Sequence, residues 1–175
     1  MDTITSILPN EAMDGFDEGF SDGLAPFFFK INCFLKDYNY DGGKNAVGTI
    51  NHYCKAYNIN QRIICMTVQK EQGALEMQVA PAQYIMDKIC GCGVLESGLP
   101  LPKFIGFENQ IAGACSTYRR WFGAFFNGVV AGITDGHDNI VNNVIAGSAI
   151  TLSLLKYTPS ISAMHLAEKV YHDHF

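Results

Sequence analysis

Glu71 is the residue whose type and position best suit it for chemistry. Ile64, Val68, Glu71 and Leu75 recur at steps of four, three and four, which places them on one face of a helix. The three apolar members predict that this face is buried. Burial disfavours the charged form of a carboxyl group, so a glutamic acid there would keep its proton near neutral pH. A general acid that protonates the leaving oxygen of a glycosidic bond needs that state.

Periodicity alone leaves a second interpretation of Glu71 open. A glutamate at a helix end can also reach solvent or pair with a lysine or arginine. The chain offers no second carboxylate in a comparable position. The other acids considered lie in or beside predicted loops, where we expect them to be solvated: Glu76, Asp87, Glu96 and Glu108.

The segments that must position Glu71 read as helices. Apolar periodicity, caps and breakers predict helices over residues 44–57 (ended by Asn58), 60–72, 82–89, 108–126, 139–156, and from Ser160 or Ser162 to about His174. Residues 26–43 form an apolar segment that ends in a turn at Asp41-Gly42-Gly43, and a glycine-containing loop is expected over 128–138. No segment alternates convincingly as a strand, so the fold class is mainly α.

Residues 1–25 differ in composition from the rest of the chain. They are acidic, and Gly15, Gly19 and Gly23 recur every fourth residue, with Phe16 and Phe20 at the same step. This spacing is compatible with a helix that docks on a partner or with a flexible arm, because each glycine opposes a helix by about 1 kcal/mol. We therefore expect an N-terminal arm over 1–25 and one helical domain over 26–175.

Composition excludes several classes of protein. The chain has 175 residues, 48% of them hydrophobic, which is enough for one sizeable core. Its 12 basic and 17 acidic residues give a net charge of −5, without the basic patch that nucleic-acid binding needs. Neither a signal peptide nor a run of about 20 apolar residues that could span a membrane is recognised.

The six cysteines predict buried, reduced thiols rather than a disulfide framework. Cys90-Gly91-Cys92 is expected to pack in a turn. A thiol hydrolase is disfavoured because the histidines lie mostly in loops or near the C-terminus. His172 and His174 with Asp173 suit a frayed, polar C-terminus better than a metal site, and no cofactor is indicated.

Four segments, in this order, resemble a family of bacterial and phage cell-wall-associated proteins with a lysozyme-like domain. They are "INQRIICMTVQKEQGAL", "APAQYIMDKICGCGVLESG", "PKFIGFENQIAGACSTYRRWF" and "NNVIAGSAITLSLLKYTPSI". The most specific pieces are Gln69-Lys70-Glu71-Gln72 and Phe107-Glu108-Asn109-Gln110, and the resemblance covers residues 48–175.

This resemblance implies a lysozyme-like or soluble lytic-transglycosylase-like fold, with Glu71 as the single catalytic acid and base facing a peptidoglycan cleft. Lytic transglycosylases need no second carboxylate, because the sugar's own groups complete the reaction. Gln110 and Tyr157 fall on the family's "NQ" and "YTP" positions and are candidate substrate contacts, although a helix-start hydrogen bond and a core position are the alternatives. Tyr84 and Ser97, on the loop that would wall the cleft, are weaker candidates.

Two departures from the family pattern concern the substrate side of the cleft. Residues 89–93, "ICGCG", replace a turn that usually contains threonine and tyrosine, and Glu76-Met77-Gln78-Val79 lies too close to Glu71 to match the "GLMQ" element of many lytic transglycosylases.

A non-catalytic function is the main alternative to the enzyme. A lysozyme-like domain can serve as a structural or binding component of a phage virion, with the N-terminal arm contacting other virion proteins. If the protein is instead an enzyme, we expect it to be delivered to the cell wall by the phage particle or released at lysis.

Overall fold

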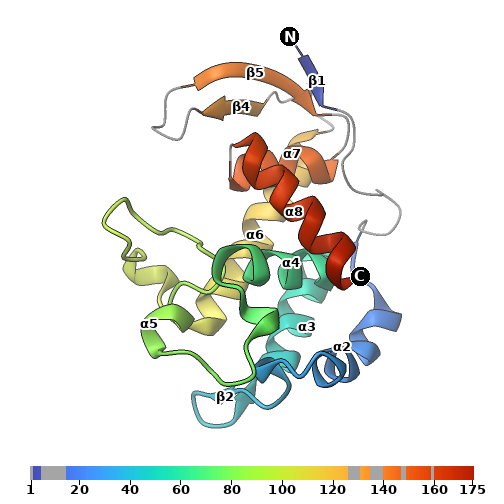
Figure 1. Ribbon diagram of the computed structural model, residues 1–175, viewed down its shortest axis with the longest axis vertical. Coiled ribbons are helices and arrows are strands. Elements are labelled where there is room, and N and C mark those ends of the chain that lie inside the picture. Colours follow the sequence, from blue (N-terminus) through green and yellow to red (C-terminus); the bar gives the residue numbers. More distant parts are fainter. Residues whose placement is uncertain (1, 5–14, 126–130, 135–139, 147–148, 159) are drawn as a thin grey trace. The chain divides into compact units, whose positions relative to one another are not determined.

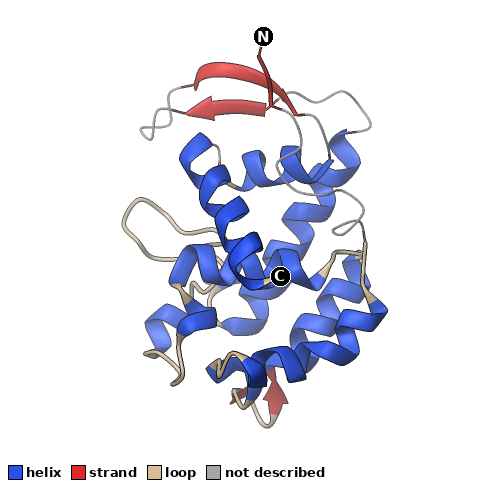
Figure 2. Ribbon diagram, turned by 45° about the vertical axis from the view of Figure 1, so that its right-hand side comes forward, coloured by secondary structure: helices blue, strands red, loops and turns tan. Residues whose placement is uncertain are grey.

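The computed structural model describes residues 2–4, 15–125, 131–134, 140–146, 149–158 and 160–175. These residues are mainly helical, as the sequence predicts (Figures 1 and 2). The chain divides into two compact units, residues 15–115 and residues 1–14 together with 116–175. Within the described ranges, no helix combines the length and apolarity that crossing a membrane requires.

The unit of residues 15–115 is built from short helices. Its elements are α2 (Glu18–Lys30), the 3-10 turn η1 (Phe34–Lys36), the hairpin strands β2 (Asn39–Tyr40) and β3 (Lys44–Asn45), α3 (Ala46–Tyr57), α4 (Gln61–Gln72), η2 (Ala74–Glu76), α5 (Gln83–Met86), η3 (Pro102–Phe104) and the first half of α6 (Phe107–Phe125). The β2–β3 hairpin closes at the turn predicted over residues 41–43.

Local signals fix the ends of α3 and α4. Asn58 adopts the left-handed conformation with φ 50° and ends α3, as predicted. Asn60 begins α4 by accepting a hydrogen bond from the Arg62 amide at 3.0 Å. Gly73, with φ 66°, ends it directly after Gln72. The helix predicted over residues 60–72 is therefore confirmed.

The core of this unit follows the predicted apolar faces. Ile64, Val68 and Leu75 are buried, and so are Ile50 of α3 and Ile111 of α6. All six cysteines are buried and unbridged, which confirms the prediction of reduced, packed thiols.

The N-terminal end of α2 is tied to the start of α4. Asp17 caps α2 by accepting from the Phe20 amide at 2.9 Å and also pairs with Arg62 at 2.5 Å. The Arg62 bond lowers the pKa of Asp17, and the bond from Phe20 acts in the same direction. The sequence left residues 1–25 open between a helix and a flexible arm. In the structure, the part from Glu18 onward is helical and belongs to α2.

The other unit contains a three-stranded sheet. Its strands are β1 (Asp2–Ile4), β4 (Ala131–Thr134) and β5 (Ile140–Ala146), in the order β1-β5-β4, with β1 parallel and β4 antiparallel to β5 (Figure 1). Helix α7 (Ala149–Tyr157) contacts β4 and β5. Helix α8 (Ile161–His174) begins at Ser160, whose hydroxyl accepts from the Ala163 amide, as predicted.

The sheet corrects two predictions. Residues 139–156 do not form one helix, because β5 occupies 140–146 and α7 begins only at Ala149. The loop predicted over 128–138 contains β4. The segment "IVNNVIA" is rich in β-branched residues, which favour strands, and short apolar runs fit helical and extended periodicities almost equally well.

Candidate functional site

Glu71 lies at the last turn of α4, on the predicted face. Ile64 and Val68, on the same face of α4, are fully buried, whereas the Glu71 side chain is 25% exposed. Leu75, predicted on this face, lies beyond the end of the helix in η2 and is 1% exposed. The carboxyl group therefore sits where a buried helix face reaches the surface. This position combines a fixed backbone with partial access to solvent.

The side chains of the Gln69–Gln72 segment form two hydrogen bonds and one ion pair. Gln69 accepts a hydrogen bond from the Leu75 amide at 2.7 Å and so closes the turn after the helix. Lys70, whose side chain is 6% exposed, places its ammonium 2.5 Å from Oε1 of Glu71. Gln72 donates to the Lys88 carbonyl at 3.4 Å, which joins the helix end to the loop that follows α5.

Glu71 packs directly against Gly91. A β-carbon built on Gly91 would lie 2.7 Å from Oε2 and 2.9 Å from Cδ of Glu71, and Gly91 has φ +67°. Both the contact and the left-handed backbone exclude a larger side chain at this position. The "ICGCG" segment, which departs from the family pattern, is thus the surface on which the carboxyl group rests.

Gln110 holds this glycine loop in place. Its Oε1 accepts from the amides of Cys90 at 3.1 Å and Cys92 at 3.0 Å. Its Nε2 donates to the carbonyls of Cys92 at 2.9 Å and Phe104 at 2.8 Å. The side chain is fully buried, and these four bonds use its whole hydrogen-bonding capacity. We therefore assign Gln110 to the support of the loop rather than to direct contact with a substrate.

The thiols beneath the loop are in an apolar environment. Burial raises the pKa of Cys90, and the neighbouring groups Cys92, Cys115 and Glu71 act in the same direction. A neutral thiol at this depth serves packing. The same loop is closed by Phe104, whose ring fills the space beside Gly93 and Gly113.

Tyr84 and Ser97 both lie at the surface of the segment between α4 and α6. Tyr84 belongs to α5, is exposed, and has the Lys88 ammonium 5.9 Å from its ring centroid. Ser97 lies in the exposed turn of a small hairpin closed by the bridge between Val94 and Pro100. Both side chains remain open to a ligand from solvent.

Tyr157 belongs to the other unit, at the end of α7. Its ring stacks on that of Tyr118, with centroids 4.7 Å apart and planes 5° from parallel. Tyr118 is fully buried, whereas Tyr157 is only half-buried and lies at the edge of the core of this unit. Its predicted contact with a substrate stays a prediction.

A second carboxylate, Glu108 at the start of α6, is held by two side chains. Lys44 lies 2.5 Å from Oε2, and the Tyr53 hydroxyl donates to Oε1 at 3.0 Å. The Lys44 bond lowers the pKa of Glu108 and outweighs the opposing effect of burial, and the Tyr53 bond lowers it further. Glu108 and His52 line an open pocket of about 280 Å³. Sequence reasoning treated Glu108 as a solvated acid, because its two partners lie over 50 positions away.

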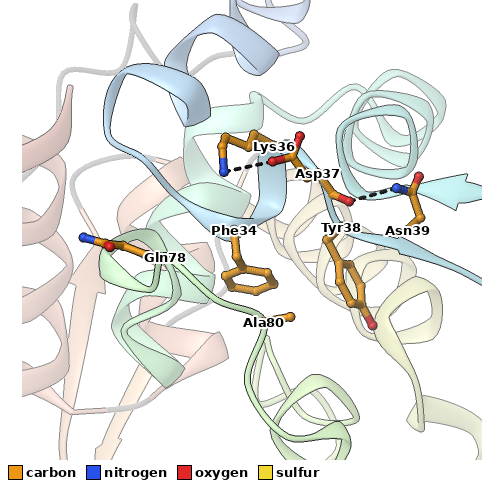
Figure 3. A pocket seen from close by; sticks show the side chains of 7 residues that line it. All are labelled: Phe34, Lys36, Asp37, Tyr38, Asn39, Gln78 and Ala80. Atoms are coloured by element: carbon orange, nitrogen blue, oxygen red, sulfur yellow. Dashed lines mark hydrogen bonds and ion pairs between the residues drawn. The ribbon is translucent and has the colours of Figure 1, made fainter.

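Two further pockets lie side by side, because both are lined by Lys36 and Asp37. One, of about 460 Å³, is drawn in Figure 3 and is lined by Phe34, Lys36, Asp37, Tyr38, Asn39, Gln78 and Ala80. The other, of about 400 Å³, is completed by Ala25, Pro26, Phe29 and Lys30. We call the two together the Lys36 groove. Glu71 lines neither part of it, nor the Glu108 pocket.

The arrangement around Glu71 can perform proton transfer. A carboxyl group on a fixed helix end, supported by a buried loop and partly open to solvent, can give a proton to a bound oxygen and take one back. Lys70 can stabilise the carboxylate between these steps. Comparison with protein-family models, with curated proteins and with solved structures found no match to this chain.

Proposed function

We propose that this protein cleaves the glycan strands of peptidoglycan by a lysozyme or lytic-transglycosylase type of mechanism, with Glu71 as general acid and base. The observation that carries the proposal is the placement of Glu71: a partly exposed carboxyl group at the end of a buried helix, packed on Gly91. We propose peptidoglycan as the substrate because Gln69–Gln72 and Phe107–Gln110 resemble segments of cell-wall-associated lysozyme-like proteins.

In the proposed reaction, Glu71 transfers its proton to the glycosidic oxygen as the bond from this oxygen to the anomeric carbon breaks. Positive charge then develops on the sugar, and the Glu71 carboxylate lies beside it. Either water or a hydroxyl of the same sugar adds to the anomeric carbon, and Glu71 takes the proton that is released. The first path gives a hydrolysed end and the second an anhydro sugar.

The Lys70–Glu71 ion pair sets a condition on this mechanism. Glu71 must give its proton to the substrate, and the ammonium of Lys70 lies 2.5 Å from its Oε1, where it blocks the approach of a glycosidic oxygen to that atom. The substrate must therefore displace Lys70 or separate it from the carboxyl group before proton transfer. Lys70 then becomes available to stabilise the carboxylate that forms.

The same ion pair favours a second candidate function. A carboxylate that is paired through one oxygen with a nearly buried lysine can serve to hold the helix end in place, with no chemistry. The protein would then be a non-catalytic lysozyme-fold component of a phage virion that binds the wall or other virion proteins. This candidate predicts assembly or binding without cleavage.

Purified peptidoglycan separates the two candidates. The wild-type protein should release soluble fragments, and Glu71→Gln, which keeps the size of the side chain, should lower the rate by at least about 100-fold. Glu108→Gln is the matched control and should retain most of the activity. Mass analysis of the fragments tells a hydrolysed end from an anhydro end. Equal rates for wild type and Glu71→Gln would refute the role of Glu71, and no release by either would favour the structural candidate.

A further inference from the structure

The Lys36 groove stands on a rigid base. The Phe34 amide donates to the Met77 carbonyl at 2.8 Å, and the Cys33 amide donates to the Phe28 carbonyl at 2.9 Å. The Cys33 thiol also donates to the Ala74 carbonyl at 3.3 Å. These bonds join η1 both to α2 and to the segment that follows Glu71. The two pockets are therefore formed before any ligand arrives, which lowers the cost of binding.

The groove carries charges of both signs: the ion pair of Lys36 and Asp37, and the further cation Lys30. Lys36 pairs with Asp37 at 2.9 Å (Figure 3), but the Asp37 side chain remains 78% exposed. Lys30, in the last turn of α2, is exposed and forms no ion pair with any residue that the structure describes. Lys30 and Asp37 both line the smaller pocket, so one ligand can place a carboxylate at Lys30 and an amine at the exposed carboxylate of Asp37.

The remaining lining is apolar at one end and amide-bearing at the other. Phe29 is 72% exposed and stands beside Pro26 and Ala25. Asn39 and Gln78 line the opposite pocket. Small apolar side chains suit the first end, and peptide groups suit the amides of the second.

The aromatic rings of the larger pocket are poorly placed to stack on a sugar. Phe34 is only 4% exposed. Tyr38 stacks on Tyr40 at a centroid distance of 5.9 Å and contacts Phe34 and Phe107 edgewise at 5.7 and 5.5 Å. These three ring contacts hold Tyr38 in an aromatic cluster with Phe34, Tyr40 and Phe107. The groove therefore favours a peptide over a saccharide.

We propose that the Lys36 groove binds the short peptides attached to the wall glycan, with an acidic residue at Lys30 and a diamino acid at Asp37. These peptides combine alanine, a γ-linked glutamate and a diamino acid, which match the apolar side chains, the cation Lys30 and the exposed carboxylate of Asp37 in the groove. The inference rests on the proposed function, because it takes the cell wall as the substrate. It adds that the protein recognises the peptide part of the wall at a site whose lining does not include Glu71.

The test measures binding of a soluble tripeptide, alanyl-γ-glutamyl-lysine, to the full chain by calorimetry and by amide NMR shifts. We expect binding of roughly millimolar strength, with shifts at residues 29–39. Lys30→Glu should weaken it by at least about fivefold, since the charge that pairs with the glutamate is reversed. Lys103→Glu makes the same change on an exposed lysine of η3, outside the groove, and should leave binding unchanged.

The outcomes separate this inference from the catalytic proposal. Peptide binding that persists in Glu71→Gln, with or without wall cleavage by the wild-type protein, supports the groove. Wall cleavage without peptide binding, or equal loss of binding in Lys30→Glu and Lys103→Glu, overturns the groove and leaves the catalytic proposal intact. Shifts at residues 29–39 on addition of N-acetylglucosamine oligomers, but not of the tripeptide, would make it a saccharide site and refute the inference.

Discussion

The carboxyl group of Glu71 lies directly on the backbone of Gly91, so close that a β-carbon on Gly91 would approach Oε2 to 2.7 Å. The two residues are 20 positions apart and belong to the end of α4 and the loop after α5. The loop is in turn held by Gln110, which is buried at the start of α6. Glu71 is therefore positioned by two segments besides its own helix.

Gly91→Ala should destabilise the protein and displace Glu71. The added methyl group meets the carboxyl group, and φ +67° disfavours any side chain. We expect a loss of roughly 2–4 kcal/mol in the free energy of unfolding, measured with urea. Gly98→Ala is the control, because Gly98 has φ +77° in the same loop but open space around it. It should lose only about 1–2 kcal/mol; equal losses would contradict the proposed contact.

Gln110→Met should loosen the loop that supports Glu71. It keeps the volume of the side chain but leaves two amides and two carbonyls of the loop without their partner. We expect a loss of roughly 3 kcal/mol and faster hydrogen exchange at the amides of Cys90 and Cys92. Asn109→Leu removes one exposed hydrogen bond and should cost at most about 0.5 kcal/mol. Unchanged exchange at both amides would argue against this role of Gln110.

The Lys44–Glu108 pair should contribute to stability only above acidic pH. The pKa of Glu108 is lowered from its ordinary value of 4.5, chiefly by Lys44, so the folded protein holds this proton less tightly than the unfolded chain does. The contribution is complete above pH 4.5 and is lost as the pH falls through the lower value in the folded state.

Urea midpoints measured from pH 3 to pH 7 test this pH dependence. Glu108→Gln and Lys44→Met should each lower the midpoint slightly at pH 7 and approach the wild type at the acidic end. At pH 7 the urea midpoint of the double variant should be little lower than that of either single variant, because both changes remove the same interaction. A difference from wild type that stays constant over the whole range would rule out this pair as the source.

The buried thiols should resist modification in the folded protein. Burial raises the pKa of Cys33 to about 11, and its thiol donates to the Ala74 carbonyl at 3.3 Å. At pH 8 we expect alkylation of the native protein to be at least about 100-fold slower than in urea, where all six cysteines should react. Ser97→Cys places a thiol in an exposed turn and should add one rapidly reacting group. Rapid reaction of the wild type would contradict the burial.

Local signals in the sequence determined α3, α4 and the position of Glu71 on α4, whereas they left α2 open. Asn58 and Gly73 end their helices through left-handed backbone conformations, and Asn60 supplies a cap from one position before α4. Such interactions span four residues or fewer, so residue types and spacing are enough to predict them. The face shared by Ile64, Val68 and Glu71 follows from the same short-range periodicity.

Only the tertiary structure decided what surrounds Glu71 and which segments form strands. Residues 144–146 of β5 pair with β1, about 140 positions earlier, and the periodicity within "IVNNVIA" does not indicate such a partner. Likewise, the sequence around Gln110 does not tell whether its side chain contacts a ligand at the surface or supports the protein from inside. Its hydrogen bonds to the amides of Cys90 and Cys92 appear only in the folded chain. Partners that meet only after the chain has folded leave no regular spacing in the sequence, because the contact depends on the path of the whole chain between them.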